Sequence, residues 1–491
     1  MIPTLRARAQ RAVAVGFAAA ALGGCHDNPA GPPPPTSAFV VVSPATLLLT
    51  PRDTVALTVR VLTQDSALIA GATVTFASSD TTLAVVSAGA VISKAKVGTG
   101  QITVTSGGVH ATLPFQVAGT PIQVVVLPHD TTITEGQSFP VTTKIVDSLG
   151  DSIRFLPLTI AIDDSLALQV TPLGTATGTS GGVATVSARH GLLVGATIIT
   201  VKDTNVIKRI PLGNAPYGVA AGKGGLVYVA PIIGTTVFRI GLPGGSLADS
   251  IAVGGGNPAE LTFDSAGDTL FVTKRIANVV GILSVAGHTQ VDSIPIPGAP
   301  YAVLLGAGRT AFVGTGSGDQ VYKVDLSTRA ATDSLAVSGA AIHMAMGAGD
   351  SLFYVALAGA GSVAEVRAST MAVTRTFTGL AGTVQDVATS PDGAELYVAD
   401  ESAGLHVVTL ADGTRTSVTT RGGTFGVTVS PDGQTIVVGT VAGFIYFLDR
   451  STHAIKHRVW VGGTPRLLRV DATTGLTVVA NEGAGEVDVV R

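Results

Sequence analysis

Six side chains in the C-terminal part of the chain could together form a site for chemistry or for binding. They are Tyr217, Glu260, Tyr301, His343, Asp386 and Arg466. The histidine and the two carboxylates are residue types that hold metal ions or transfer protons. The two tyrosines and the arginine suit a binding site, in which aromatic surface is combined with a few charges. The set therefore fits either a hydrolytic site or a site for a ligand or a peptide.

Motifs that would mark an enzyme around these residues are missing. The chain contains neither a His-Glu-x-x-His pair nor a Gly-x-x-x-x-Gly-Lys loop for phosphates. One histidine and two carboxylates from separate segments also arise easily by chance. We therefore predict binding without catalysis, with no cofactor and no metal, and we keep a hydrolase as the alternative.

The six candidates share one register in a repeat that runs from Val206 to Arg491. An apolar pair recurs about every 40 to 43 residues, which is the spacing of β-propeller blades. The pairs are Tyr228-Val229, Phe271-Val272, Phe312-Val313, Tyr354-Val355, Tyr397-Val398, Val437-Val438 and Val478-Val479. A second marker, often containing proline, precedes each pair by about a dozen residues. These markers are Ala215-Pro216, Asn257-Pro258, Ala299-Pro300, Ala340-Ala341, Thr383-Val384, Thr424-Phe425 and Thr464-Pro465.

Turn signals between the two markers complete the pattern of a blade. The clearest are the Ser-Pro-Asp-Gly sequences that begin at Ser390 and Ser430, where proline and glycine suit successive turn positions. Four short strands fit each repeat, so the sequence predicts a seven-bladed β-propeller. The last repeat lacks a fourth strand, and we expect residues 206–210 to pair with residues 486–490 and close the ring. Because first strands line the central channel of a propeller, the six candidates are expected at the channel mouth.

Composition limits the other classes of function. Charged residues make up 13% of the 491 residues and the net charge is −3, so nothing favours a nucleic-acid partner. A single cysteine excludes an internal disulfide framework and a multi-cysteine metal site. The 61 glycines and 25 prolines favour short strands joined by tight turns.

The cysteine lies at the end of a secretion signal. Residues 1–11 carry three arginines and no acid, and an apolar run from Ala12 to Leu22 precedes Leu22-Gly23-Gly24-Cys25. This ending resembles the lipobox of bacterial lipoproteins, which implies cleavage after residue 24 and a lipid on Cys25. The alternative is an ordinary signal peptide. With His26 and not Asp after the cysteine, the resemblance implies an outer-membrane or cell-surface location, with contact to the membrane through the lipid anchor alone. Residues 25–38 contain Pro32-Pro33-Pro34-Pro35 and are predicted to be an extended linker.

Between the linker and the repeats, residues 39–118 and 119–202 show period-two apolar patterns that predict two β-sandwich domains. In the first, Phe76-Ala77-Ser78-Ser79-Asp80 and Gly98-Thr99-Gly100-Gln101-Ile102-Thr103-Val104 resemble bacterial immunoglobulin-like group 2 domains. The second is similar at its edges, with Val124-Val125-Val126 and Gly182-Val183-Ala184-Thr185-Val186, and departs from the pattern in its middle. The resemblance implies spacer or adhesive modules.

Residues 203–491 resemble the YVTN family of repeats, which is close in fold to lactonase-like seven-bladed propellers. The best matches are Gly213-Asn214-Ala215-Pro216-Tyr217-Gly218-Val219-Ala220 and Ser390-Pro391-Asp392-Gly393-Ala394-Glu395-Leu396-Tyr397-Val398. We thus expect an all-β lipoprotein in which two immunoglobulin-like domains precede a seven-bladed propeller. The propeller is expected to bind an envelope protein, a polysaccharide or a small ligand. A lactonase-like hydrolase at the channel mouth and a purely structural or adhesive surface protein are the alternatives.

Overall fold

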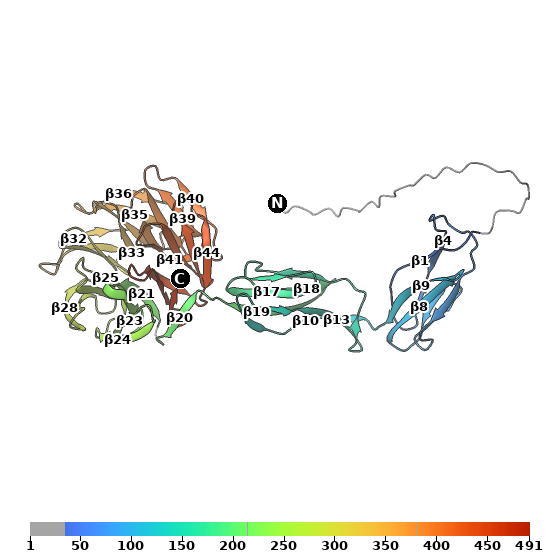
Figure 1. Cartoon of the computed structure of the whole chain (residues 1–491). Helices are drawn as coiled ribbons and strands as arrows, with labels where there is room; N and C mark the ends of the chain where they lie inside the picture. Colours follow the sequence, from blue (N-terminus) through green and yellow to red (C-terminus); the bar gives the residue numbers. More distant parts are fainter. Residues whose placement is uncertain (1–34, 214, 381) are drawn as a thin grey trace, which may run out of the picture. The chain divides into compact units, whose positions relative to one another are not determined.

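The structure is a computed structural model that describes residues 35–213, 215–380 and 382–491 (Figure 1). The signal peptide, Cys25 and the linker up to residue 34 lie outside the described residues. Within the described part, no helix is long and apolar enough to cross a membrane.

Strands are the main regular structure of the described residues, and the single helical segment among them is a 3-10 turn at Lys223–Gly225. The prediction of an all-β chain is therefore confirmed. The chain divides into two compact units. The first comprises the residues up to Pro121 together with Asp147–Phe155, and the second comprises Ile122–Val146 and Leu156–Arg491.

The first unit is built from small sheets around one apolar core. Its strands are β1 (Phe39–Ser43), β2 (Leu47–Leu49), β3 (Thr54–Ala56), β4 (Thr58–Leu62), β5 (Thr75–Ser78), β6 (Ala84–Ser87), β7 (Ala90–Ser93), β8 (Gly98–Ser106), β9 (Val109–Val117) and β14 (Ser152–Ile153). The sheets have the orders β2-β9-β8-β5, β3-β7-β6 and β1-β4. Strand β8 alternates buried and less buried residues, and Ile102 lies opposite Leu113 of β9 in the core. The period-two sequence pattern thus places one face of the sheet inside.

The first part of the second unit has sheets of the same order. Its strands are β10 (Pro121–Leu127), β11 (Thr131–Thr134), β12 (Ser138–Pro140), β13 (Thr142–Asp147), β15 (Thr159–Ile162), β16 (Leu168–Val170), β17 (Thr175–Gly178), β18 (Gly182–His190) and β19 (Leu193–Lys202). The sheet β11-β19-β18-β15 begins with a parallel pair, as β2-β9-β8-β5 does. The three-stranded sheet β12-β17-β16 corresponds to β3-β7-β6. This shared order agrees with two copies of one module.

Seven four-stranded antiparallel sheets follow. Six of them use consecutive strands: β21 (Pro216–Ala221), β22 (Leu226–Pro231), β23 (Thr236–Gly241) and β24 (Ser246–Ala252); β25 (Pro258–Phe263), β26 (Thr269–Lys274), β27 (Val279–Ser284) and β28 (Thr289–Pro295); β29 (Pro300–Leu305), β30 (Thr310–Thr315), β31 (Gln320–Asp325) and β32 (Ala330–Ala336); β33 (Ala340–Met346), β34 (Leu352–Ala358), β35 (Ser362–Arg367) and β36 (Ala372–Phe377); β37 (Val384–Thr389), β38 (Glu395–Asp400), β39 (Gly404–Thr409) and β40 (Arg415–Val418); β41 (Thr424–Val429), β42 (Thr435–Thr440), β43 (Phe444–Asp449) and β44 (Ile455–Trp460).

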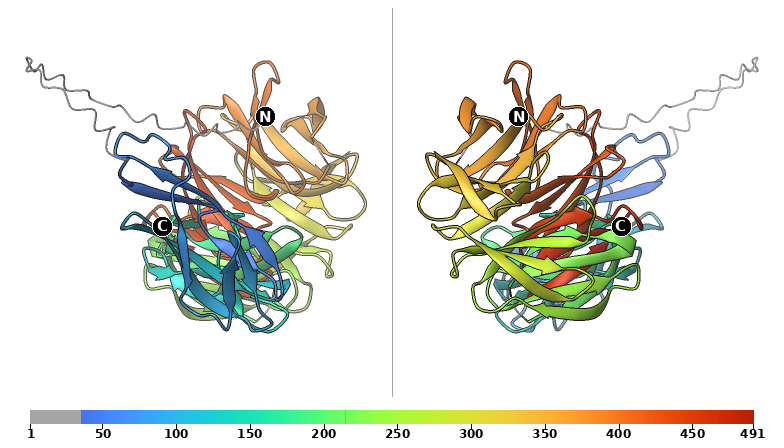
Figure 2. Two further views of the ribbon diagram at one scale, coloured as in Figure 1. Left: turned by 90° about the vertical axis from the view of Figure 1, so that its right-hand side faces the viewer. Right: turned by 90° about the vertical axis from the view of Figure 1, so that its left-hand side faces the viewer.

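The seventh sheet joins the two ends of this region. It consists of β45 (Pro465–Val470), β46 (Thr477–Asn481), β47 (Glu486–Val490) and, as its fourth strand, β20 (Val206–Pro211). The predicted pairing of residues 206–210 with 486–490 is confirmed. Each first strand contacts the first strands of the two neighbouring sheets, including β45 with β21. Figure 2 shows the green first sheet beside the red last one, an arrangement consistent with a β-propeller.

Packing between neighbouring sheets explains the apolar pairs of the sequence. Second strands are buried on both faces, so they read as continuous apolar runs and do not alternate. Tyr228, Phe312 and Tyr397 come from these pairs and are almost fully buried. Fourth strands such as β24 and β32 lie at the periphery and are mostly exposed. Each sheet is therefore stable only when its neighbours cover it.

Candidate functional site

A β-bulge interrupts the first strand of every one of the seven sheets, just after the sequence marker. The register shifts lie at Pro216/Gly218, Pro258/Leu261, Pro300/Ala302, Ala341/His343, Val384/Asp386, Thr424/Gly426 and Pro465/Leu468. A bulge leaves one or more residues unpaired and redirects their side chains. The six candidate residues lie at these bulges or directly after them, which explains how one register can turn side chains from several sheets towards one place.

An aromatic group forms the centre of the cluster. The Tyr217 hydroxyl and His343 Nε2 are 3.2 Å apart, and the two rings are stacked with an interplanar angle of 17°. The Tyr301 ring meets Tyr217 edge-on, with centroids 5.5 Å apart. The residues come from β21, β29 and β33, so the structure brings together side chains from three sheets.

Two carboxylates flank the other edge of the imidazole. His343 Nδ1 lies 3.6 Å from Glu260 Oε1 and 3.9 Å from Asp386 Oδ1. Both distances exceed that of a hydrogen bond, and His343 Nδ1 has no hydrogen-bond partner among the described residues. Arg469 Nη2 lies 3.9 Å from Glu260 Oε1 and brings a second positive charge to the group. The contacts of the imidazole with the carboxylates are thus electrostatic.

The carboxylates of Glu260 and Asp386 also join neighbouring first strands through hydrogen bonds. The Val303 N–H donates to Glu260 Oε2 over 3.0 Å, and the Val427 N–H donates to Asp386 Oδ2 over the same distance. Each of these donors lies on the first strand of the next sheet. The backbone therefore already uses one oxygen of each carboxylate to hold adjacent sheets in register.

Burial and charge set the protonation of the central residues. Burial alone lowers the pKa of His343, but the charges of Asp386 and Glu260 outweigh it and hold that pKa above its ordinary value. Burial raises the pKa of Asp386, although His343 and Arg469 oppose this change. Burial, together with the neighbouring Tyr301, raises the pKa of Tyr217 well above its usual range. The two acids therefore favour the protonated form of the imidazole, and burial favours the neutral form of the phenol.

The cluster has a sealed inner layer and a partly open rim. Only 5% of Tyr217, 6% of Glu260, 1% of His343 and 3% of Asp386 is exposed. Tyr301, by contrast, is partly exposed. The sequence places all six residues at the channel mouth, whereas four of them, Tyr217, Glu260, His343 and Asp386, are buried in the structure.

The rim contains residues that the sequence register does not single out. The Arg466 guanidinium lies 3.8 Å from the Phe425 ring centroid, and its Nε is ion-paired with Glu482. The Arg275 guanidinium lies 4.9 Å from the Tyr301 ring centroid. Arg275 and Glu482 follow the second strands β26 and β46, and the first-strand register could not reveal them. Each of the two residues directly follows the apolar second strand of its repeat, and a search of that sequence position would have found both.

The geometry offers little to a metal or to a nucleophile. The described residues include no group of three His, Cys, Asp or Glu side chains arranged to hold a metal ion. A literal Gly-x-Ser-x-Gly sequence occurs at residues 178–182, but it connects strands β17 and β18. A nucleophile elbow requires a strand-to-helix turn, so this match has no catalytic setting.

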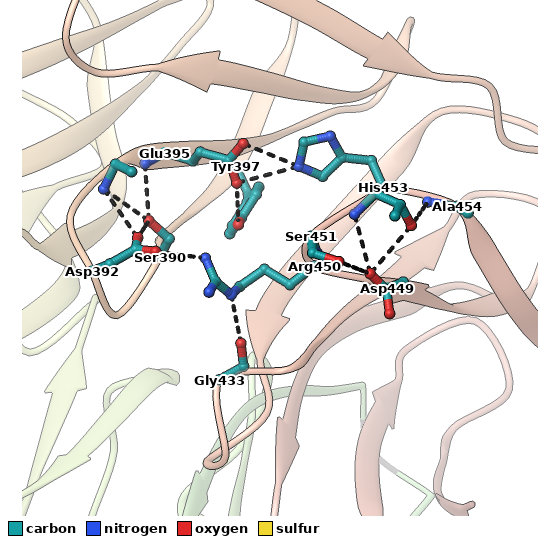
Figure 3. Close-up of polar contacts among 12 residues, drawn as sticks. Ser390, Asp392, Glu395, Tyr397, Gly433, Asp449, Arg450, Ser451, His453 and Ala454 are labelled. Carbon is teal, nitrogen blue, oxygen red and sulfur yellow. Dashed lines mark hydrogen bonds and ion pairs between the residues drawn. The ribbon is translucent and has the colours of Figure 1, made fainter.

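A second polar cluster links the fifth and sixth sheets of the ring (Figure 3). Arg450, in the hairpin between β43 and β44, donates from Nη1 to Asp392 Oδ2 over 2.9 Å and from Nε to the Gly433 carbonyl over 2.6 Å. In the same hairpin, His453 Nε2 lies 3.1 Å from Glu395 Oε1. The Tyr397 hydroxyl donates to Glu395 Oε2 over 2.7 Å. These side chains fill the space between the two sheets.

Comparisons with known proteins give a likeness in fold. No family model matches the chain, and no curated protein matches its sequence. Among solved structures, the chain is similar to Kuenenia stuttgartiensis hydrazine synthase, with a TM-score of 0.52 and 16% sequence identity. The match covers 59% of this chain and 97% of that chain. At this identity the likeness concerns the fold alone, and it agrees with an all-β repeat structure of the propeller kind.

Proposed function

We propose that the chain is a bacterial lipoprotein that carries a seven-bladed YVTN-like β-propeller (203–491) on two immunoglobulin-like modules (39–118 and 119–202). In this proposal Cys25 bears the lipid, and the protein resides at the outer membrane or the cell surface. The propeller binds a partner of the envelope, which is a protein, a polysaccharide or a small ligand. Ring contacts between the seven first strands and the shared sheet order of the two modules support this architecture.

The rim of the first-strand cluster is the observation that carries the binding role. Tyr301, Arg275 and Arg466 combine aromatic surface with guanidinium groups, which are the side chains enriched at binding hot spots. The buried layer contacts the rim through the edge-on packing of the Tyr301 ring against Tyr217 and His343. Two large apolar side chains are exposed nearby in the loops after the second strands: Ile233 is 63% exposed and Ile276 is 71% exposed. Exposed apolar side chains beside aromatic and cationic groups favour contact with a partner.

The same geometry argues against the hydrolase. A general base needs to reach a substrate, whereas His343 is buried and its Nε2 faces the Tyr217 hydroxyl. Glu260 and Asp386 are each engaged by a backbone N–H of the neighbouring strand. These contacts favour a structural role for the inner residues and a binding role for the rim.

The experiment compares the full chain with variants of the rim and of the inner layer. Purified wild-type protein is screened on glycan arrays and against envelope extracts, and each captured partner is tested on Tyr301→Ala and Arg466→Ala. Lys208→Ala, on the exposed strand β20, is the matched surface control. Binding that is lost in the rim variants and kept in the control supports the proposal. Lactone turnover that disappears in His343→Ala would establish the hydrolase, and adhesion that survives both rim variants would favour the structural role.

A further inference from the structure

A cavity of about 300 Å³ lies between the sixth sheet, β41–β44, and the seventh sheet, β20-β47-β46-β45. Its inner wall contains Val437 and Phe447, which are 1% and 7% exposed. Asp471 also lines the cavity and is 1% exposed. Pro431 and Asp432 are exposed at its edge. The cavity is therefore mostly apolar, with the buried carboxylate of Asp471 in its wall and the exposed carboxylate of Asp432 at its edge.

Asp471, which lines this cavity, has an unused acceptor. The N–H and the hydroxyl of Thr474 both donate to Asp471 Oδ2, over 2.7 Å and 2.6 Å. Asp471 Oδ1 is buried and has no hydrogen-bond partner among the described residues. No lysine or arginine lines the cavity. A buried carboxylate oxygen without a partner is costly, so a cationic donor that enters the cavity would be bound favourably.

The neighbouring sheet boundary shows which group fits such a space (Figure 3). Asp392 has the same place in its Ser-Pro-Asp-Gly turn as Asp432 has in the next one. At Asp392 a guanidinium fills the gap between the sheets, because Arg450 reaches across from the hairpin after β43. The fold therefore already places an arginine side chain at this position one sheet earlier.

Two differences leave the boundary between the sixth and seventh sheets open. Val437, opposite Thr428, occupies the register position of Tyr397, opposite Ala388, and its side chain is much smaller. The second difference is one of topology. Strands β47 and β20 of the seventh sheet come from opposite ends of the ring, so no hairpin equivalent to the one that carries Arg450 connects them. The space that Tyr397 and Arg450 fill in the neighbouring boundary is left free here.

We infer that this cavity is a binding site for an arginine side chain of a partner polypeptide, whose guanidinium pairs with Asp471 Oδ1. A volume of about 300 Å³ is at the lower limit for small-molecule pockets and suits one long side chain. Val437 and Phe447 contact its alkyl part, and Asp432 adds negative charge at the entrance. The site shares no residue with the cluster around Tyr217 and His343. The inference can therefore be tested independently of the proposed function.

The test measures binding of short peptides to the full chain by calorimetry. The probe is acetyl-Gly-Arg-Gly-amide, and its control carries citrulline, which has the shape of arginine without the charge. We expect millimolar or tighter binding of the arginine peptide and at least about tenfold weaker binding of the citrulline peptide. Equal affinity for the two peptides, or no binding of the arginine peptide, overturns the inference. If agmatine binds more tightly than the peptide, the inference that the bound arginine belongs to a polypeptide is overturned.

Two variants assign the binding to this cavity. Asp471→Asn keeps the shape of the side chain and removes its charge, and we expect it to weaken binding of the arginine peptide by at least about tenfold. Val437→Tyr introduces the side chain that the neighbouring sheet carries at this position, and it should abolish binding by filling the cavity. Wild-type affinity in Asp471→Asn overturns the inference even if Val437→Tyr does not fold.

Discussion

Arg209 on β20 lies directly opposite Asp488 on β47, and its Nη1 is 3.3 Å from Asp488 Oδ1. The same nitrogen lies 2.7 Å from Glu486 Oε1 and donates to the Val461 carbonyl oxygen over 2.6 Å. Asp488 is fully buried, and Asn481 Nδ2 donates to its other oxygen over 2.8 Å. One side chain from the start of the ring is thereby tied to three groups near its end.

We predict that Arg209→Ala destabilises the ring. The change leaves the buried Asp488 without its cationic partner, but Arg209 is 39% exposed and solvent screens part of the interaction. We expect a loss of about 1–2 kcal/mol in the free energy of unfolding, measured by denaturation of the full chain. Arg329→Ala is the control, because Arg329 and Asp292 form an exposed pair whose loss should change stability by less than about 0.5 kcal/mol. An equal effect of the two substitutions would contradict the closure role of Arg209.

A pH effect follows from the burial of Asp488. Burial raises its pKa to about 7, despite the hydrogen bond from Asn481 and the charge of Arg209. In the unfolded chain an aspartate has a pKa near about 3.9, so the folded state holds the proton more tightly. The resulting stabilisation is complete below about pH 4 and is lost as the pH rises towards about 7.

Asp488→Asn should remove this component. Relative to the wild type, the variant is expected to gain stability as the pH rises from about 4 to about 7, by an amount on the order of a few kcal/mol. The measurement is the difference in free energy of unfolding between the two proteins across that range. A difference that does not change with pH would show that Asp488 does not titrate there.

The repeat markers suffice to predict the seven four-stranded sheets and the pairing of the first strand, β20, with the last, β47. The apolar pairs recur because second strands are covered on both faces, and the missing fourth strand of the last repeat is supplied by β20. The convergence of Tyr217, Tyr301 and His343 also follows from their common register. The burial of Tyr217 and His343 does not, because it depends on bulges and on the stacking of the two rings. The stacking has no signature in a single sequence.

The cavity beside Asp471 shows a further limit of the sequence. Val437 stands among the apolar pairs as one more branched residue, and nothing in the repeat pattern marks it as smaller than its space. The cavity opens because β47 and β20 close the ring without a hairpin between them. Only the closed ring therefore reveals that one sheet boundary differs from its neighbour.

The imidazole of His343 is expected to be important for stability. His343→Ala removes the imidazole between Glu260 and Asp386 and leaves a cavity, so we expect a loss of about 2–4 kcal/mol. Adding Glu260→Gln should restore part of this loss, because Gln can still accept the Val303 N–H and carries no charge. Denaturation of the single and double variants measures the recovery. No recovery would mean that the cavity dominates and not the repulsion between the acids.

The contribution of His343 should also depend on pH. Its pKa is held above the ordinary value of about 6.5, so its stabilisation is complete below that pH and is lost as the pH rises through the folded-state pKa. The difference in stability between the wild type and His343→Gln is therefore expected to shrink in alkaline solution. A difference that is constant from pH 5 to pH 9, a range of about four units, would show that folding leaves the pKa of His343 unchanged.

The turn that carries Asp392 in Figure 3 should make the stability of the protein depend on acid, with a larger contribution from Ser390 than from Arg450. The pKa of Asp392 is lowered to about 2, first by the Ser390 hydroxyl, then by the Ala394 N–H, and to a smaller extent by Arg450. Its stabilisation is complete above the ordinary pKa of about 3.9 and is lost as the pH falls towards about 2. Ser390→Ala should therefore reduce the acid dependence of stability more than Arg450→Met does, since the hydroxyl donates to Asp392 Oδ1 and contributes most to its low pKa. Thermal unfolding of both variants at stepped acidic pH values measures this order, and the reverse order would assign the low pKa to the ion pair with Arg450.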